Sequence, residues 1–173
     1  NHVMGGSTLV FGNFFSFPNP VNEYAARTVA GCVLILSLVA SLTLWLPLAI
    51  FLAYGFTARV LTGPTMSPVG LLATRLIVPK IIKKEKDVAG PPKRFAQAIG
   101  FLFSASALLL LIGDQGSVAR ILYLVLALFA ALESIISFCA GCWAFGLLMR
   151  AGLIPEKVCL ECNNLNFGES RSD

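Results

Sequence analysis

The stretch TVAGCVLILSLVASLTLWLPLAIFLAYGFTARVL, residues 28–61, decides the fold class of this chain, because it contains no charged side chain before Arg59. As one helix rising about 1.5 Å per residue it would be about 51 Å long, far more than a bilayer core roughly 30 Å thick. Pro47 lies near its midpoint, and proline breaks a helix interior but suits a first helical turn. We therefore predict a tight hairpin with transmembrane spans at about 28–45 and 47–61.

The overall composition is also that of a membrane protein. Apolar residues make up 57% of the 173 residues and charged residues only 13%, whereas a soluble domain carries about 25% charged residues. The single histidine is His2, so no Ser/His/Asp arrangement can be assembled and haem ligation within the spans is disfavoured. The sequence contains no phosphate-binding glycine-rich loop and no nucleic-acid signature. Bound lipids or chlorophyll-type pigments remain compatible with it.

Two further apolar stretches complete the predicted architecture. A third span is expected at 95–112, followed by a turn at 113–116 and a fourth apolar stretch at 121–149. The fourth stretch is longer than one span needs, so we expect its last part to enter the interface or to bend near Gly141 and Gly146. The predicted fold is an all-α polytopic membrane protein with four transmembrane helices in two hairpins.

A polar and basic stretch, roughly 62–94, separates the two hairpins. Ser67-Pro68 resembles a helix N-cap followed by proline, and the apolar residues 69–82 with interspersed cations favour an interfacial helix. Gly90-Pro91-Pro92 is expected to lie in an exposed loop. Residues 75–94 carry seven Lys/Arg and two acids, so the positive-inside rule places this loop and both termini on the cytoplasmic, stromal or matrix side. The membrane is then a bacterial inner membrane or an organellar inner or thylakoid membrane.

We divide the chain into a Phe/Pro-rich arm at 1–26, a transmembrane domain at 27–150 and a polar tail at 151–173. The arm has four phenylalanines between positions 11 and 17 and poor helical periodicity. It is either a disordered or surface-lying segment or a contact for a partner protein. Asn22 is expected to cap the first helix, which then begins at Glu23.

Four cysteines form two CxxC pairs, Cys139/Cys142 and Cys159/Cys162, with the spacing C-x2-C-x16-C-x2-C. This spacing fits a zinc site built from all four thiolates. It also fits a redox system in which Cys139 and Cys142, on one helical face, form a reversible disulfide. An iron–sulfur cluster and simple packing are further alternatives. The apolar residues after Cys142 count against zinc, because four thiolates give the site a net negative charge. Cys32 is assigned to packing.

Glu133 is an ionisable residue inside the fourth span, which makes it a functional candidate. Glu133 follows Arg120 by 13 residues, and Arg59 follows Leu46 by 13 residues. Both side chains therefore lie about 20 Å in from the same membrane face. We predict an intramembrane ion pair between Arg59 and Glu133, with Gln97 as a further partner. The pair is either structural or part of a proton or ion relay.

Small residues recur at helical spacing in the third and fourth spans, where they permit close helix approach. They are Gly100, Ser104 and Ala107, and then Ala130, Ser134, Ser137 and Gly141. These faces and the N-terminal arm are the expected contacts with other membrane-protein subunits, alongside the lipids.

Three segments carry a family resemblance: Lys93-Arg94-Phe95-Ala96, Leu132-Glu133-Ser134 and Phe138-Cys139-Ala140-Gly141-Cys142. Together they resemble domain-of-unknown-function family 4395, small four-helix membrane proteins, over roughly residues 20–150. The family carries no established activity. The resemblance implies thiol or sulfur chemistry at the cysteine pair of the last segment.

Two functional hypotheses follow. The first is an integral membrane protein with a paired-CxxC thiol redox or zinc site at the positive-side membrane surface, in which Cys139 and Cys142 are the redox candidates. The second is a non-catalytic accessory subunit of a large photosynthetic or respiratory complex. The sequence leaves open whether the protein is an enzyme.

Overall fold

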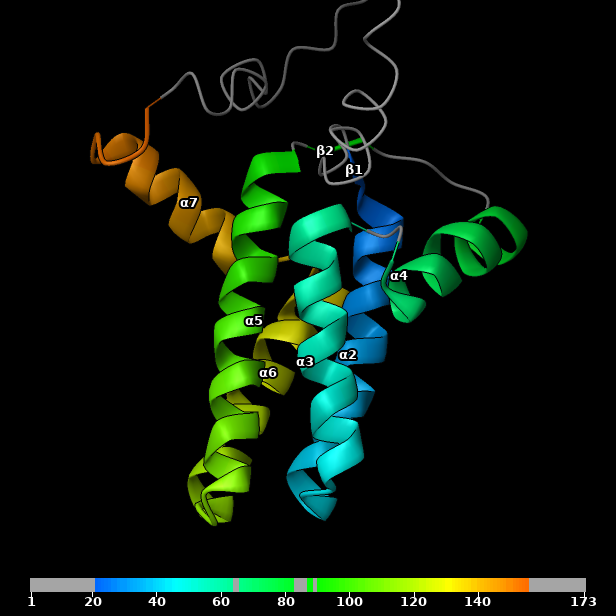
Figure 1. Ribbon diagram of the computed structural model, residues 1–173. Coiled ribbons are helices and arrows are strands. Elements are labelled where there is room, and N and C mark those ends of the chain that lie inside the picture. Colours follow the sequence, from blue (N-terminus) through cyan, green and yellow to red (C-terminus); the bar gives the residue numbers. More distant parts are fainter. Residues whose placement is uncertain (1–20, 64–65, 83–86, 89, 156–173) are drawn as a thin grey trace, which may run out of the picture.

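The computed structural model describes residues 21–63, 66–82, 87–88 and 90–155. Its centre is a helical bundle (Figure 1). The bundle consists of α2 (Glu23–Thr43), α3 (Leu46–Thr62), α5 (Gly90–Ile112) and α6 (Gly116–Ile136). Among the described residues, α2, α5 and α6 are long and apolar enough to cross a membrane, and α3 is a shorter apolar helix. The chain is therefore an α-helical membrane protein.

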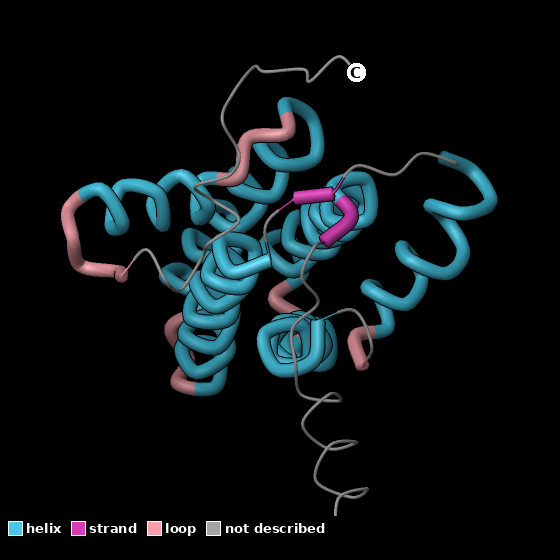
Figure 2. The backbone as a smooth tube through the Cα atoms, turned by 90° about the horizontal axis from the view of Figure 1, so that it is seen from above, coloured by secondary structure: helices cyan, strands magenta, loops and turns pink. Residues whose placement is uncertain are grey.

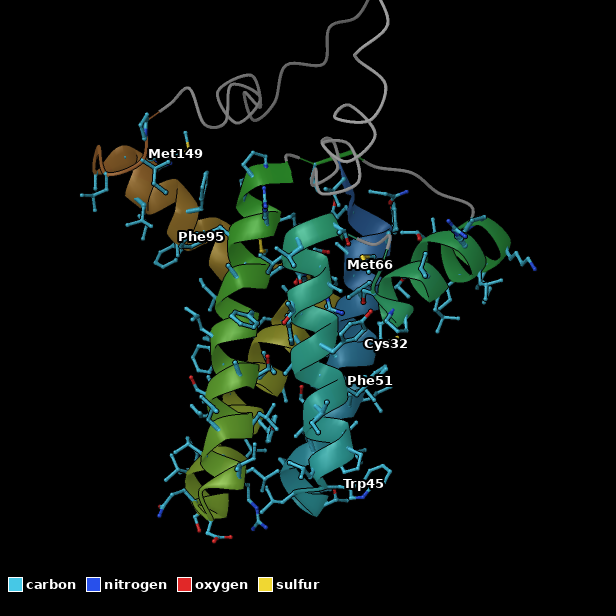
Figure 3. The ribbon with its side chains drawn as sticks, viewed as in Figure 1. Cys32, Trp45, Phe51, Met66, Phe95 and Met149 are labelled. Atoms are coloured by element: carbon cyan, nitrogen blue, oxygen red, sulfur yellow. A yellow bond between two sulfur atoms is a disulfide. The ribbon has the colours of Figure 1, made fainter. Side chains whose placement is uncertain are left out.

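The first two helices begin and end as the sequence predicts. The Asn22 side chain accepts hydrogen bonds from the backbone N–H groups of Tyr24 and Ala25, at 2.9 and 3.4 Å, which caps the free end of α2. α2 stops at Leu44, whose φ of 49° is left-handed, and Pro47 lies in the first turn of α3. Figure 3 places Trp45 at this tip of the bundle, where an indole side chain favours a membrane–water interface.

The bundle packs through small side chains. Helix α2 lies mainly against α6, and α3 lies mainly against α5, which also contacts α6. One core cluster consists of Ala40, Ala49, Leu52, Ala107, Ala119 and Tyr123, and another of Val29, Val33, Phe56, Val69, Ala73, Leu126 and Ala130. Large apolar side chains such as Leu42, Leu109 and Ile135 point outward and are 69–78% exposed. This arrangement suits a lipid surrounding.

Two segments leave the bundle sideways, on different sides (Figures 1 and 2). The first comprises α4 (Pro68–Leu72) and a π-helix, η2 (Ala73–Ile82). The second is α7 (Ala140–Arg150), whose Phe145 packs against Phe95 of α5 with ring centroids 5.6 Å apart. Figure 3 shows Phe95 and Met149 on this side of the molecule.

The segment after α3 agrees in part with the expected interfacial helix at 69–82. Ser67 caps α4 by accepting a hydrogen bond from the backbone N–H of Gly70, as predicted. Pro79 lies inside η2, whose wider π-helical turn was not foreseen. An apolar side chain, Leu76, and a cationic side chain, Lys80, are both exposed on η2.

Three predicted boundaries are wrong. Gly90-Pro91-Pro92 was expected to lie in a loop but begins α5, because proline needs no N–H partner in a first helical turn. The fourth apolar stretch breaks at Ser137, with a left-handed φ of 63°, rather than near Gly141 or Gly146. The arm boundary at residue 26 is too late, because α2 begins at Glu23, as the Asn22 cap predicts; residues 1–20 of the arm lie outside the described residues.

A short strand pair closes the end of the bundle opposite the helix turns. β1 (Val21–Asn22) and β2 (Asp87–Val88) are antiparallel, with Val21 opposite Val88. The pairing ties the chain before α2 to the chain before α5.

Most of the predicted small-residue stripes pack inside this chain, although Ser137 is exposed. A Cβ added to Gly100 would lie 2.2 Å from the Phe56 ring, so the ring of α3 rests directly on the backbone of α5. A Cβ on Gly31 of α2 would meet the Ser134 hydroxyl of α6 at 3.1 Å. These glycines let the helices approach within the bundle, and contacts with another subunit are not needed to explain the stripes.

Candidate functional site

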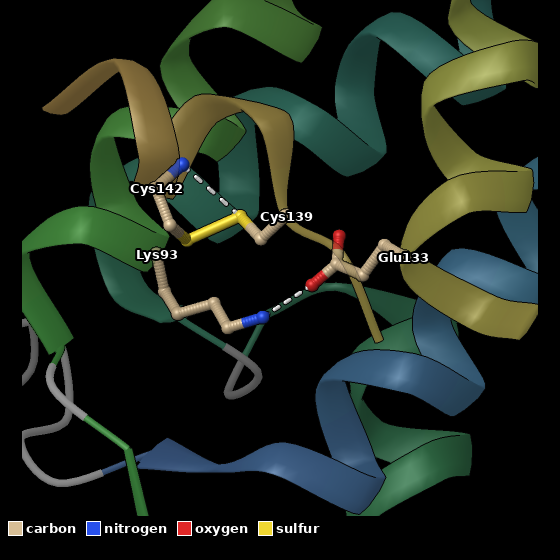
Figure 4. The surroundings of a disulfide bond; sticks show 4 residues. All are labelled: Lys93, Glu133, Cys139 and Cys142. Carbon is tan, nitrogen blue, oxygen red and sulfur yellow. Dashed lines mark hydrogen bonds and ion pairs between the residues drawn. A yellow bond between two sulfur atoms is a disulfide. The ribbon is translucent and has the colours of Figure 1, made fainter. Parts of the chain in front are cut away.

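The break between α6 and α7 places the first CxxC pair at the start of a helix. Cys139 is the N-cap of α7, and its Sγ accepts a hydrogen bond from the backbone N–H of Cys142 at 3.2 Å. The two cysteines are joined as a disulfide, with Cα atoms 5.2 Å apart (Figure 4). Both are partly buried. The expected proximity of Cys139 and Cys142 is therefore present, although Cys139 precedes the helix instead of lying on its face.

Arg27 covers the end of α6 on the other side of the same break. Its guanidinium donates hydrogen bonds to the backbone carbonyls of Ser134 and Ile135, at 3.1 and 3.4 Å. A cation at a helix C-terminus satisfies the last carbonyls and offsets the negative end of the helix dipole. Arg27 thus holds the point at which the chain turns from α6 towards Cys139.

Glu133 forms an ion pair with Lys93, whose Nζ donates to the Glu133 Oε1. The two side chains are only 10% and 15% exposed. Figure 4 shows this pair beside the disulfide. The predicted ion pair between Arg59 and Glu133 is wrong. Counting residues from the hairpin turns placed Glu133 correctly near the end of the bundle away from those turns. Lys93 was expected at the end of a loop, but it lies inside α5 and reaches the Glu133 carboxylate.

Arg59 instead organises the beginning of α4. Its Nε donates to the Gln97 Oε1 at 2.9 Å and its Nη1 to the Ser67 Oγ at 3.1 Å. The guanidinium carbon lies 4.5 Å from the centroid of the Phe56 ring, a cation–π contact. The side chain is buried, at 5% exposure. The predicted role of Gln97 as a partner is confirmed for Arg59.

A cavity of about 210 Å³ connects these elements. Helices α2, α3, α5, α6 and α7 all contribute to its wall, which is mostly apolar. Three polar or reactive residues lie on that wall: Gln97, Glu133 and Cys139. Glu133 of the ion pair and Cys139 of the disulfide thus line the same partly open cavity.

The zinc prediction needs Cys159 and Cys162, which lie outside the described residues. Within residues 21–63, 66–82, 87–88 and 90–155, no group of three or more His, Cys, Asp or Glu side chains is arranged to hold a metal ion. Cys139 and Cys142 are joined to one another. Cys32 is a free, partly buried cysteine in α2 that packs beside the core, which agrees with its assignment to packing.

Sequence reasoning missed two residues at this site. Lys93 belongs to a Pro-Pro-Lys-Arg sequence, and the prolines were the available signal that a helix begins there. Arg27 has no local signal, because its acceptors are more than 100 positions away. Only the packing of α2 against α6 brings them together.

Comparison with known proteins gives one match. No curated protein and no solved structure matches the chain. The family model described as domain of unknown function DUF4395 matches residues 21–150, a region that contains the four-helix bundle, the ion pair and the Cys139–Cys142 disulfide. The chain belongs to the DUF4395 family.

Proposed function

We propose that this protein is a membrane-embedded thiol–disulfide exchange protein whose working pair is Cys139/Cys142. The single observation that carries the proposal is the placement of this disulfide at the N-terminus of α7, with the Cys139 Sγ accepting the Cys142 N–H. Backbone N–H groups and the positive end of the helix dipole stabilise the thiolate that forms when a disulfide at this place is reduced.

The proposed reaction is balanced between two thiol pairs. A thiolate of the substrate attacks one sulfur of the Cys139–Cys142 disulfide, so one S–S bond breaks and a mixed disulfide forms. The second substrate thiol then resolves the mixed disulfide. The substrate leaves oxidised, and Cys139 and Cys142 hold its two electrons as thiols after taking up two protons. Cys159 and Cys162 are proposed as the next pair in the exchange or as zinc co-ligands.

The same proposal includes four membrane crossings. Helix α3 (Leu46–Thr62) lies alongside α5 for much of its length, and α5 is long enough to span a bilayer. We therefore assign α3 as a span in two hairpins, α2–α3 and α5–α6, with η2 and α7 at the interface. Seven described Lys and Arg residues belong to the end away from the hairpin turns: Arg27, Arg59, Arg75, Lys80, Lys93, Arg94 and Arg150. Arg120 is near the turns. This distribution favours the cytoplasmic, stromal or matrix side for the disulfide.

A redox titration tests the exchange function. The full chain carrying Cys32→Ala, Cys159→Ser and Cys162→Ser keeps only the proposed pair. It would be equilibrated in detergent with reduced and oxidised glutathione at graded ratios, and free thiols would then be trapped with a mass-tagged maleimide. We expect a two-electron transition between dithiol and disulfide.

Two outcomes would contradict this proposal. One is a pair that stays reduced, or stays oxidised, across the whole range set by glutathione and dithiothreitol. The other is a pair that forms only mixed disulfides with glutathione and never an internal disulfide. Arg150→Gln, at the exposed far end of α7, provides a matched control that should titrate as the parent does.

A further inference from the structure

The cavity beside the disulfide has a composition that fits one chemical class of ligand. Its apolar wall includes the aromatic side chains Phe56, Phe103 and Phe129. Phe103 and Phe129 form an edge-to-face pair with ring centroids 6.0 Å apart. An apolar cavity of about 150 Å³ can hold a benzene ring, so a space of about 210 Å³ accommodates one substituted six-membered ring.

Gln97 is a polar residue on this wall, and its side-chain amide has a hydrogen-bond donor whose direction Arg59 restricts. Its Oε1 accepts from the Arg59 guanidinium, and this contact orients the amide so that its NH₂ group faces away from Arg59. Among the described residues no acceptor bonds to that NH₂ group. A donor held on the wall of an apolar cavity selects a ligand that carries an acceptor, such as a carbonyl oxygen.

Glu133 adds a proton-accepting group to the same wall. One of its oxygens is held by Lys93, and Glu133 lines the cavity. The Lys93 partner stabilises the charged carboxylate in an apolar setting. Cys139, whose disulfide with Cys142 stores two electrons on reduction, lies on this wall as well.

We propose that this cavity binds the ring of a lipid-soluble quinone, which oxidises the Cys139/Cys142 dithiol. This inference rests on the proposed exchange function and names its terminal oxidant. An S–S bond forms as the two S–H bonds break, and the two electrons and two protons reduce the quinone to a hydroquinone with two new O–H bonds. Gln97 donates to a quinone carbonyl, the phenylalanines enclose the ring, and Glu133 accepts a thiol proton. The isoprenoid tail remains among the lipid-facing helices.

The test is quinone reduction by the reduced protein. The single-pair protein, with Cys32, Cys159 and Cys162 replaced as above, would be reduced with dithiothreitol, desalted and mixed with decylubiquinone in lipid nanodiscs. Quinone absorbance and maleimide-accessible thiols would be followed together. We expect one hydroquinone for each dithiol lost, and no reaction when Cys139 or Cys142 is replaced by serine.

Two matched variants connect the reaction to the cavity. Ala144→Phe fills the space from α7, because Ala144 lines it, and it should raise at least tenfold the quinone concentration at which dithiol oxidation reaches half its maximal rate. Leu147→Phe adds a ring to the exposed side of the same helix, where Leu147 is 42% exposed, and should leave this half-saturating concentration unchanged. The glutathione titration of both variants should match the parent, because the disulfide itself is retained.

The possible results separate the two proposals. Cycling with glutathione without quinone reduction would overturn the quinone inference and leave thiol exchange standing. Quinone reduction that is equally fast in Ala144→Phe and the parent would also overturn it, because the ring would then react outside the cavity. A pair that cycles with neither oxidant would overturn both proposals.

Discussion

Replacement of Gly141 by alanine should push α7 away from α5. Gly141 is the second residue of α7, two positions after the N-cap Cys139. A Cβ at this position would lie 2.6 Å from both the Cα and the Cβ of Ala96. The Cα of Ala96 is backbone inside α5, so no side-chain rotation can relieve the overlap.

The expected cost follows from this distance. Carbon atoms in favourable contact lie about 3.5–4.0 Å apart, so α7 must withdraw by about 1 Å to accept the methyl group. Overpacking of this kind costs about 1–3 kcal/mol, and the higher helix propensity of alanine returns about 0.5–1 kcal/mol. The two ranges leave a net loss of about 0–2.5 kcal/mol, with a midpoint of about 1.3 kcal/mol. At about 2–4 °C per kcal/mol, the midpoint corresponds to a fall in Tm of about 3–5 °C.

The assay is thermal unfolding followed by far-UV circular dichroism in one detergent, with Gly146→Ala as the matched control. Gly146 is in the same helix, and a Cβ added there meets nothing within 4 Å. The control should therefore gain about 0.5–1 kcal/mol from helix propensity alone. The two alanine variants should move the Tm in opposite directions.

A Gly141→Ala protein as stable as Gly146→Ala would refute this reasoning. That result would mean that α7 does not rest against Ala96, and α7 would then no longer be fixed as one wall of the cavity. Gly141→Ser provides a further check, because a side chain that also begins with a Cβ should cost at least as much.

Three other substitutions are expected to change the Tm in the same assay. Lys93→Met leaves the Glu133 carboxylate buried without its partner and should lower the free energy of unfolding by about 3–5 kcal/mol. Adding Glu133→Gln should recover part of that loss. Equal Tm values for the single and double variants would argue against the pair. Arg27→Met frees carbonyls at the end of α6 and should cost about 1–2 kcal/mol; an unchanged Tm would contradict a capping role. Tyr123→Phe should leave the Tm unchanged or raise it, because the buried Tyr123 hydroxyl has no partner among the described residues and an unbonded buried hydroxyl costs about 1–3 kcal/mol. A lower Tm would show that this hydroxyl has a partner.

The helical bundle was predictable because it depends on local signals. An uncharged run with one central proline specifies two helices and the turn between them, and Leu44 and Trp45 occupy that turn. The caps at Asn22 and Ser67 were also predictable, since a side-chain oxygen before a helix start bonds the nearest free N–H groups. Such features need no knowledge of the distant chain.

The site was less predictable because its contacts are long-range. The choice of Lys93 over Arg59 as the partner of Glu133 depends on how α5 sits against α6, which helical depth alone does not determine. The break at Ser137 carries no glycine or proline signal. The backbone N–H groups of Ser137 and Phe138 close the end of α6 by bonding to the carbonyls of Glu133 and Leu132, and Arg27 adds long-range hydrogen bonds to the Ser134 and Ile135 carbonyls. The contacts of Arg27 and Lys93 with α6 come only from the tertiary structure.

The cations at the end of the bundle opposite the hairpin turns stabilise the fold as well as favour one orientation in the membrane. Helices α3 and α6 both finish here, and the last carbonyls of each accept hydrogen bonds from an arginine: Val60 from Arg94, and Ser134 from Arg27. Each cation offsets the negative end of a helix dipole and satisfies a carbonyl that has no partner within the helix. Capping at two helix ends therefore requires cations where the positive-inside rule also favours them.

This capping also determines the electrostatic surroundings of the disulfide. Cys139 lies between the C-terminus of α6 and the N-terminus of α7, so two helix dipoles of opposite sign meet near its sulfur. Because Arg27 occupies the carbonyl end of α6, the N–H groups of α7 are the nearest helix terminus left to act on the sulfur. Arg27 caps the C-terminus of α6, and the N-terminus of α7 faces Cys139. This arrangement stabilises negative charge on the sulfur during exchange. The arginine that stabilises the fold thus prepares the cysteine pair for the proposed chemistry.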